Sequence, residues 1–323
     1  EPYVSDWSET AHYEPKPVLL RKSSLEQGLI EWNAIPQASL YQVEAADVKD
    51  GPWSQVYRGP MPANPLPSIS GRWYRARGIR EDGGSIVEST AWSPALQSGS
   101  NGFVTAVGTV LKEQGGTGPV IILRGINLGN VFLIEPWMLF GVTHLAAQKP
   151  PKEPDDAQET GYDPTIAIHD DWQLRDIVTN RFGSAATTDI LTLHRETYLQ
   201  EADLDNIIRL GVNFVRLPIY YRDIRELDAN GNWVGSAFRF DHIDRIVDLC
   251  ADRGLYVLVD LHGAPGGQSA QDNTGHMDFN KLFAQTSEGL VYRTRTVELW
   301  REVARHYRNN TTVVGYDLLN EPV

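Results

Sequence analysis

Residues 255–263 read LYVLVDLHG, and this stretch decides the fold of the second half of the chain. It is apolar along most of its length, which is typical of a strand buried on both faces of a parallel sheet. Similar apolar runs lie at 120–123, 212–217 and 313–319, with longer segments of helical periodicity between them. Because strands alternate with helices, the pattern predicts βα units on a parallel sheet.

The helical segments carry one apolar face each. The residues predicted to face the core are Leu204, Ile207 and Ile208 in the first helix, Ile243, Ile246, Val247 and Cys250 in the second, and Trp300, Val303, Ala304 and Tyr307 in the third. A complete (β/α)8 TIM barrel needs eight strands and typically about 250 residues. Residues 119–323 therefore predict the N-terminal half of such a barrel, with its first four strands. The long excursion at 141–195 predicts a functional rim.

Residues 17–98 show short β-type runs separated by turn signals. Among these signals is Asp82-Gly83-Gly84, which predicts a hairpin turn. The spacing of the runs predicts an antiparallel, all-β immunoglobulin-like sandwich. Residues 1–16 would then be an N-terminal extension, and residues 99–118 a linker followed by a hairpin at the floor of the barrel. We therefore expect a multi-domain chain.

The aromatic residues of this segment also fit a known module. Trp32 lies in the second predicted strand, Tyr41 in the third, and Trp73-Tyr74-Arg75-Ala76-Arg77 near the end. In these positions the segment resembles a fibronectin type III module. The resemblance implies a role in spacing or positioning, because the segment has no pair of carboxylates near a recognisable pocket.

The charge balance of the chain disfavours some partners. With 42 acidic and 29 basic residues, the formal net charge is −13, so nucleic acid and anionic membrane surfaces are not expected to bind. No apolar run approaches the roughly 20 residues that span a bilayer. A neutral partner such as a polysaccharide fits this charge balance better. A secreted or periplasmic location fits such a substrate, although the single cysteine, Cys250, also permits a cytosolic one.

Polar residues stand at the predicted ends of the barrel strands. Arg216 ends the second strand, His262 the third, and Asn320 with Glu321 the fourth, while Glu135 follows the first. Active sites of such barrels lie at the C-terminal ends of the strands. We therefore expect these side chains to share one site.

Four motifs follow one another in the order typical of one enzyme family: LRGINL at 123–128, VRLP at 215–218, DLHG at 260–263 and LNEP at 319–322. From residue 104 to residue 323 the chain resembles the N-terminal half of glycoside hydrolase family 5. The stretch HGAPGGQSAQDNTG at 262–275 and the EPW at 135–137 are most similar to the exo-β-1,3-glucanase and β-glucosidase branch.

The resemblance implies a retaining, exo-acting hydrolase with a β-glucan, above all β-1,3-glucan, or an oligosaccharide as its substrate. It also implies a role for each of the candidate residues. Glu321 would be the general acid/base, and Asn320 would hold the 2-hydroxyl of the sugar. Arg216 and His262 would orient the nucleophile and the reacting ring. The polar residues that would hold a terminal glucose are Glu135, Asp272 and Asn273.

Hydrolysis with retention needs a proton donor for the leaving oxygen and a second carboxylate about 5–5.5 Å away that attacks the anomeric carbon. By the resemblance, that nucleophile ends strand seven, beyond residue 323, so activity is expected to need the second half of the barrel. Two alternatives stay open: an endo-acting β-glycanase of the same family, and a non-catalytic carbohydrate-binding protein. The family's Gly-Trp is replaced by Asn130-Val131-Phe132, which leaves the linkage specificity open.

Each candidate also has a structural interpretation. Arg216 could form a salt bridge in the core, His262 could be a buried and hydrogen-bonded histidine, and Asp272-Asn273 could be a plain turn. We expect no metal, because His262 and His276 lack a third ligand at a suitable spacing. The glycines at 263–267 lack the Lys-Ser/Thr of a phosphate loop, so no nucleotide cofactor is expected.

Overall fold

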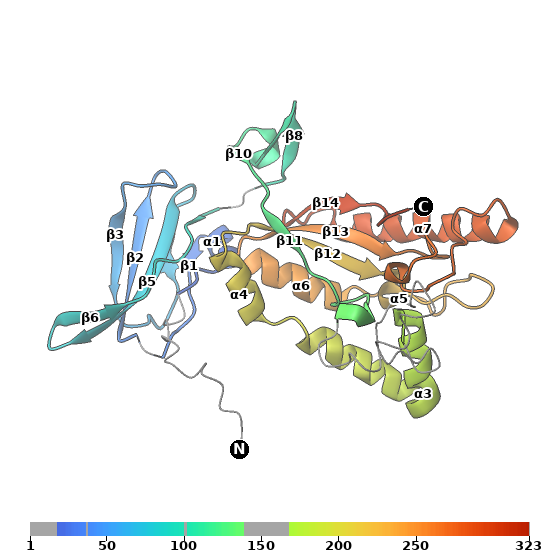
Figure 1. Cartoon of the computed structure of the whole chain (residues 1–323). Coiled ribbons are helices and arrows are strands. Elements are labelled where there is room, and N and C mark those ends of the chain that lie inside the picture. Colours follow the sequence, from blue (N-terminus) through green and yellow to red (C-terminus); the bar gives the residue numbers. More distant parts are fainter. Residues whose placement is uncertain (1–17, 37, 100–101, 139–167, 323) are drawn as a thin grey trace, which may run out of the picture. The chain divides into compact units, whose positions relative to one another are not determined.

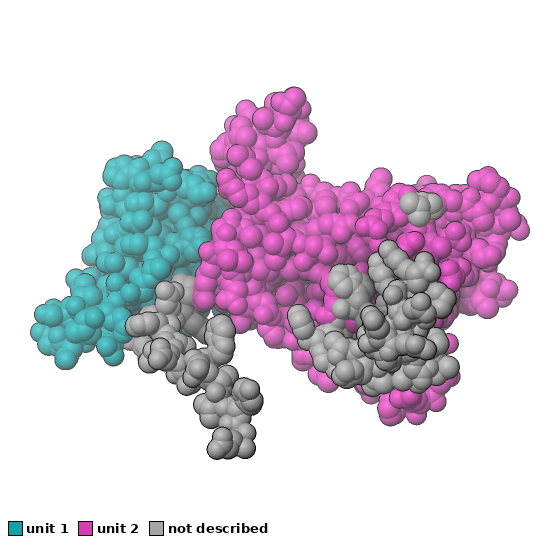
Figure 2. Space-filling view, viewed as in Figure 1, with its two compact units in different colours: residues 1–101, 252–254 teal, residues 102–251, 255–323 magenta. Residues whose placement is uncertain are grey.

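The computed structural model describes residues 18–36, 38–99, 102–138 and 168–322. The chain forms two compact units, one of residues 1–101 with 252–254, the other of residues 102–251 with 255–323 (Figure 1, Figure 2). The predicted extension at 1–16 and the part of the predicted rim at 141–167 lie outside the described residues. None of the described helices is both long and apolar enough to cross a membrane.

The first unit is an antiparallel β region. Its elements are α1 (Lys22–Glu26), β1 (Leu29–Ile30), β2 (Leu40–Ala46), β3 (Ser54–Gly59), β4 (Leu66–Pro67), β5 (Trp73–Asp82), β6 (Ser85–Ser89) and β7 (Leu96–Gln97). The main sheet has the order β3-β2-β5-β6, β7 pairs with β5, and β1 pairs with β4. The prediction of an antiparallel region is confirmed, while its likeness to a fibronectin type III module stays a prediction.

Alternation of side chains explains the core of this unit. Tyr41, Val43 and Ala45 of β2 point to one face and are buried, as period-two strands require. They pack around Trp32, whose ring centroid lies 5.8 Å from that of Tyr41. The predicted hairpin turn is confirmed, since Asp82 pairs with Ser85 across β5 and β6.

The second unit begins with a small antiparallel sheet in the order β10-β9-β8, formed by β8 (Thr105–Val107), β9 (Val110–Lys112) and β10 (Val120–Ile121). The prediction that 120–123 is the first parallel strand was therefore wrong. After residue 121 the chain bonds to a side chain instead of a strand: Asn213 donates to the Ile122 carbonyl at 3.0 Å and accepts from the Arg124 amide at 2.7 Å. The exposed side chains of Val120 and Ile122 show that this apolar run is not core.

A four-stranded parallel sheet forms the body of the second unit. It consists of β11 (Gly125–Asn127), β12 (Phe214–Tyr220), β13 (Tyr256–Gly263) and β14 (Val313–Asp317), in this spatial order. The helices are α3 (Asp171–Thr197), α4 (Glu201–Arg209), α5 (Tyr221–Ile224), α6 (Asp241–Asp252) and α7 (Ser287–Tyr307) (Figure 1). Short 3-10 turns lie at η1 (Gln114–Gly116), η2 (Pro136–Met138) and η3 (Asp272–Thr274). The predicted succession of strands and helices on a parallel sheet is confirmed.

The predicted helix faces are mostly correct. The named residues of α4 and α6 are buried in one cluster with the strands. In α7, Leu299, Val303 and Tyr307 form the buried face, at intervals of four residues. Trp300 is only half-buried, and Ala304 is exposed, so the prediction for Ala304 was wrong. Ala304 lies one position beyond the buried face of α7, and exposing so small an apolar side chain to water costs little free energy.

We expect Leu217→Ala to lower the free energy of unfolding by about 2–5 kcal/mol, because Leu217 of β12 has no exposed surface and truncation leaves a cavity. Leu210→Ala is the matched control, since Leu210 is 78% exposed. This substitution should change the free energy of unfolding by less than about 0.5 kcal/mol. Urea denaturation of both variants measures the difference. Equal losses would contradict the assignment of Leu217 to the core.

Candidate active site

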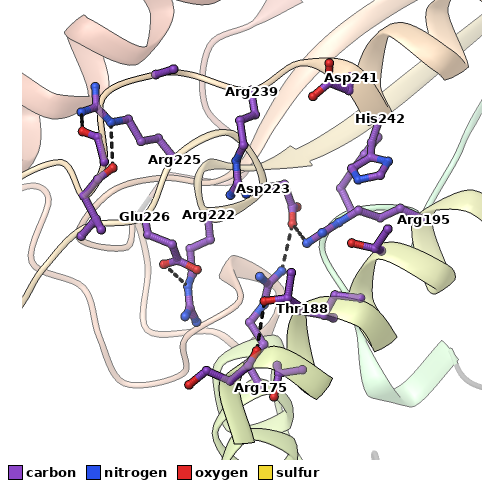
Figure 3. A pocket seen from close by; sticks show the side chains of 18 of the residues that line it. Arg175, Thr188, Arg195, Arg222, Asp223, Arg225, Glu226, Arg239, Asp241 and His242 are labelled. Atoms are coloured by element: carbon purple, nitrogen blue, oxygen red, sulfur yellow. Dashed lines mark hydrogen bonds and ion pairs between the residues drawn. The ribbon is translucent and has the colours of Figure 1, made fainter.

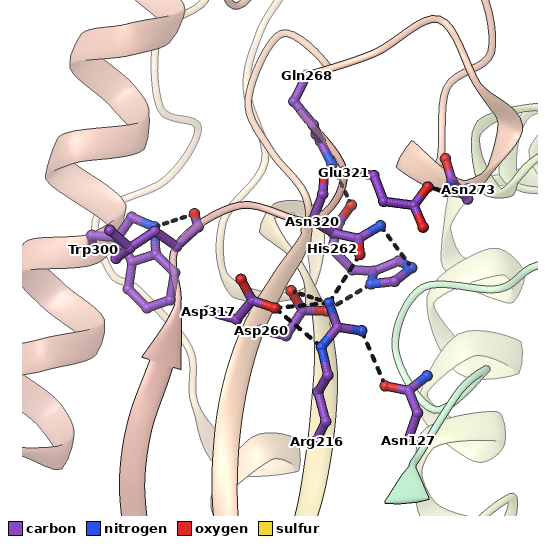
Figure 4. Close-up of polar contacts among 11 residues, drawn as sticks. Asn127, Arg216, Asp260, His262, Gln268, Asn273, Trp300, Asp317, Asn320 and Glu321 are labelled. Carbon is purple, nitrogen blue, oxygen red and sulfur yellow. Dashed lines mark hydrogen bonds and ion pairs between the residues drawn. The ribbon is translucent and has the colours of Figure 1, made fainter. Parts of the chain in front are cut away.

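The C-terminal ends of the parallel strands bring polar side chains into one cluster. The strand register places Asn127 of β11 beside Arg216 of β12, and Asp260 of β13 beside Asp317 of β14. Figure 4 shows their side chains pointing toward one another. The cluster therefore depends on the sheet, because a shift of one residue in any strand would turn its side chain to the other face.

Arg216 is the centre of this cluster. Its Nε and Nη2 donate to Asp317 Oδ2 at 3.1 and 2.9 Å, and its Nη1 donates to Asn127 Oδ1 at 3.2 Å. Its Nη2 also lies 3.0 Å from Asp260 Oδ1 and donates to Asn320 Oδ1 at 2.9 Å. One guanidinium thus joins residues of all four strands, a task for which its planar fork of donors is suited. Arg216 lies inside β12, which continues to Tyr220, so the prediction that Arg216 ends this strand was wrong.

Asp260 fixes the orientation of His262. Its carboxylate has no exposed surface, and Oδ2 lies 2.6 Å from His262 Nδ1. Burial raises the pKa of the Asp260 carboxyl, while His262 and Arg216 act in the opposite direction. The contact of Nδ1 with Asp260 orients the His262 ring so that Nε2 is directed at Asn320.

The orientation of the Asn320 amide follows from these two neighbours. Its Oδ1 accepts from Arg216, so its Nδ2 is the atom directed at His262 Nε2, 3.4 Å away. Gln268, fully buried, donates from Nε2 to the carbonyls of His262 and Asn320 at 2.7 and 2.9 Å. Asn320 is held at both its side chain and its backbone, so the position of the next residue is restricted.

That next residue is Glu321. Its φ is +41°, a left-handed backbone conformation that non-glycine residues rarely adopt and that occurs preferentially at functional sites. Its side chain is exposed, and Oε2 accepts from Asn273 Nδ2 at 2.7 Å. The predicted acid/base and one predicted sugar-binding residue are therefore in direct contact.

Glu135 and Asp272 lie in two further loops. The Glu135 amide donates to Asn130 Oδ1 at 2.7 Å, and Asn130 adopts a left-handed φ of +61°, which asparagine tolerates better than most residues. Asp272 begins η3, and its Oδ1 accepts from the Asn273 amide at 3.0 Å. The Asn130 position that departs from the family motif thus shapes the loop that carries Glu135.

The segment that carries most of this arrangement is similar to a known protein family. Residues 174–323 match the family model described as cellulase (glycosyl hydrolase family 5). The segment at 174–323 is therefore similar to glycosyl hydrolase family 5. It corresponds to part of the family's barrel, so the predicted fold class is supported in this coarser form.

Named relatives of the chain include two fungal glycosidases. A beta-xylosidase of Phanerodontia chrysosporium is 36% identical over 220 residues, which cover 68% of this chain and 39% of that protein. A glucan 1,3-beta-glucosidase of Candida oleophila is 31% identical over 207 residues, covering 62% and 42%. The rutinosidase structure from Aspergillus niger is 16% identical, with a TM-score of 0.44 and coverage of 62% and 48%. The chain spans about two fifths of the length of these two curated relatives.

Four residues in or beside the polar cluster at the parallel strands were not predicted from the sequence. They are Asn127, Asp260, Gln268 and Asp317. Asp260 could have been found, because it lies two positions before His262 and residues two apart on a strand share a face. Asp317 could not, because its partner Arg216 is 101 residues away.

A separate polar cavity of about 840 Å³ lies between α3, α5 and the start of α6, as Figure 3 shows. None of its described lining residues belongs to the polar cluster at the parallel strands, which we call the strand-end cluster and which consists of Asn127, Arg216, Asp260, His262, Asp317 and Asn320. The Asp223 carboxylate accepts a hydrogen bond from Arg175 Nη2 at 3.1 Å and also pairs with Arg195. These two contacts connect α5 to α3. Among the described residues, no group of three or more histidine, cysteine or acidic side chains could hold a metal ion.

We expect Arg216→Met to lower the free energy of unfolding by about 3 kcal/mol at pH 7, because the buried Asp260 carboxylate loses its guanidinium. Burial already raises the pKa of Asp260, so its ionised form is disfavoured in the folded state and its penalty grows as the pH rises through that pKa. The loss should therefore be smaller near pH 4 than at pH 7.

Urea denaturation at both pH values measures this effect. Arg209→Met, at an exposed position of α4, is the matched control. Adding Asp260→Asn to Arg216→Met should recover part of the loss, because it removes the unpaired charge. A loss independent of pH in the single variant would show that Arg216 contributes packing rather than charge.

Proposed function

We propose that this chain is part of a retaining β-glycoside hydrolase that removes sugar units from the end of a β-glucan, with β-1,3-glucan as the favoured substrate. The observation that carries the proposal is the position of Glu321. It follows Asn320, which Arg216 and His262 hold, and it accepts a hydrogen bond from Asn273. Similarity to family 5 supports hydrolysis of O-glycosyl bonds.

In the proposed reaction, Glu321 first gives its proton to the leaving glycosidic oxygen. A carboxylate outside these residues attacks the anomeric carbon from the opposite side and forms a covalent glycosyl-enzyme. Glu321, now ionised, then removes a proton from the water that hydrolyses this intermediate. Asn320 is proposed to bind the 2-hydroxyl, where its oriented amide can strengthen its contact as the transition state forms.

Action at a chain end is supported by the loops. Asn273 contacts Glu321, and the loops that carry Glu135 and Asp272 meet where Gly275 packs against Leu133. A Cβ atom at Gly275 would lie 3.2 Å from Leu133 Cδ1 and 2.9 Å from the Tyr220 ring. Converging polar groups can recognise the free hydroxyls of a terminal sugar.

The names of the relatives support two classes of sugar. One relative is a glucan 1,3-beta-glucosidase and another a beta-xylosidase, so a terminal xylose is the second candidate. A polymeric substrate also supports a location outside the cytoplasm, secreted or periplasmic. We propose that the N-terminal β region acts as a spacer or positioning module, in line with its resemblance to a fibronectin type III domain.

Glu321→Gln tests the acid/base role in the polypeptide that carries this chain together with the rest of its barrel. Turnover of glycans with sugar leaving groups should fall by about 10²–10⁴-fold, the usual contribution of general acid catalysis. Activated aryl glucosides need little protonation, so their covalent intermediate should accumulate, and added azide should restore turnover with a β-glucosyl azide as the product. Full activity of the variant on laminarin would exclude Glu321, and an α-azide would exclude retention.

The products distinguish the remaining candidates. Hydrolysis of laminarin should release glucose alone, because the substrate is held by its terminal ring. The same preparation should hydrolyse p-nitrophenyl β-glucoside faster than p-nitrophenyl β-xyloside. A ladder of oligosaccharides would favour an endo-acting enzyme, faster xyloside hydrolysis a β-xylosidase, and binding of laminarin without hydrolysis a carbohydrate-binding protein.

A further inference from the structure

Two adjacent buried carboxylates begin α3, Asp170 with 1% and Asp171 with 0% of its surface exposed. Neither belongs to the strand-end cluster. Asp170 is the N-cap of the helix, where its Oδ1 accepts from the Gln173 amide at 2.7 Å. Its other oxygen, Oδ2, accepts from the Met277 amide at 2.7 Å. One carboxylate thus caps the helix and binds a loop 107 residues away.

Asp171 makes the corresponding contact with the other loop. Its Oδ2 accepts from the Ile134 amide at 3.1 Å, directly before Glu135. Arg175 pairs with the same carboxylate and reaches Asp223 at 3.1 Å. Both carboxylate oxygens of Asp171 thus have donors, which offsets the cost of burying this group away from water.

The next residue completes the attachment. The Trp172 amide donates to the Gly275 carbonyl at 2.9 Å. The Trp172 ring stacks on His276 at 4.3 Å with an interplanar angle of 7°. Residues 275, 276 and 277 are therefore each bound to the start of α3. Asn273, which contacts Glu321, lies two residues before this attachment.

The far end of α3 holds the first loop a second time. His194 Nε2 lies 2.7 Å from the carbonyl oxygen of Asn130, and the Asn130 side chain accepts from the Glu135 amide. The 130–135 loop is thus bound at Ile134 by the first turn of α3 and at Asn130 by its last turn. The backbone of α3 is kinked at Gly183, whose φ of +84° and ψ of 163° are not helical, so α3 consists of two helical parts. The two parts of α3 are consequently the common support of both loops.

We propose that Asp170 and Asp171 are positioning residues of the active site: Asp170 holds Asn273 against Glu321, and Asp171 holds Glu135 for the terminal sugar. This inference rests on the proposed function. The division of labour has a kinetic consequence. Loss of the Asp170 contact should affect the proton transfer by Glu321, whereas loss of the Asp171 contact should affect the binding of substrate.

Asparagine is the sharpest replacement at both positions, because it keeps the shape but offers one oxygen where two are used. Asp170→Asn can keep the helix cap while turning an N–H toward the Met277 amide. In the complete enzyme, its kcat on an oligosaccharide should fall about 10- to 100-fold with little change in KM. Asp171→Asn should instead raise KM about tenfold and leave kcat nearly unchanged.

The control is Asp189→Asn, an exposed position on the same helix, which should change neither constant. A second test uses Asn273→Ala: Asp170→Asn should add no further loss of kcat to this variant, because both remove the same contact. Independent, multiplying losses would overturn the role of Asp170. A fall in kcat without a rise in KM for Asp171→Asn would overturn that of Asp171.

A readout without turnover separates this inference from the proposed function. In the 323-residue chain, amide hydrogen exchange at Met277 should become at least about tenfold faster in Asp170→Asn, and at Ile134 in Asp171→Asn. The Asn273 side-chain amide signal should shift in Asp170→Asn and not in Asp189→Asn. Unchanged signals in folded variants overturn the positioning roles whatever the reaction is, while altered signals in a protein without glycosidase activity uphold the attachment and refute the proposed function alone.

Discussion

The candidate site depends on one buried charge, the carboxylate of Asp260. A carboxylate without exposed surface is costly unless cationic or hydrogen-bonding groups surround it, and here Arg216 and His262 do so. Each of these partners is oriented by the contact. The contact with Asp260 orients the His262 ring. It also holds the Arg216 guanidinium where it can bind Asn320. The geometry around Glu321 therefore depends on the partners that the buried Asp260 carboxylate requires.

The sequence was sufficient to predict the parts of the fold in which local pattern and burial agree. The runs at 212–217 and 255–261 contain the buried strands β12 and β13, and the stripes of α4 and α6 face the core as their spacing predicts. The run at 313–319 contains strand β14, but only Val313 of that strand is buried, and Leu318 is 65% exposed. The run at 120–123 shows the limit. It is as apolar as the others, but Val120 pairs with Lys112 in an antiparallel sheet, and the apolar pattern does not encode the partner.

The same limit applies to the site. Polar residues in and just after the apolar runs can be read from the chain, so Arg216, His262 and Asn320 were predicted, and they are in contact. The point at which β12 ends, at Tyr220, was not predicted correctly. Asp317 and Gln268 act through partners distant in sequence, which only the register of the sheet and the path of a loop reveal. The roles of Asp170 and Asp171 were hidden for the same reason, since their acceptor atoms bind backbone amides, and a backbone amide leaves no mark in the sequence.

Gln268 has a consequence for how this edge of the sheet can vary. The strand pairing of β13 and β14 ends at Asp260 and Asp317, and one further backbone bond follows it, from the Asn320 amide to the Leu261 carbonyl at 3.1 Å. Beyond that bond, the Gln268 amide bonds the carbonyls of His262 and Asn320. The Gln268 side-chain amide has two N–H donors where a peptide unit has one, so it can bond both carbonyls at once. Gln268 therefore serves as a surrogate rung that extends the ladder past its last backbone bond. The loop around it is free to change in length and composition as long as that amide returns to the same place, so neighbouring specificities can evolve without disturbing the residues that carry out the chemistry.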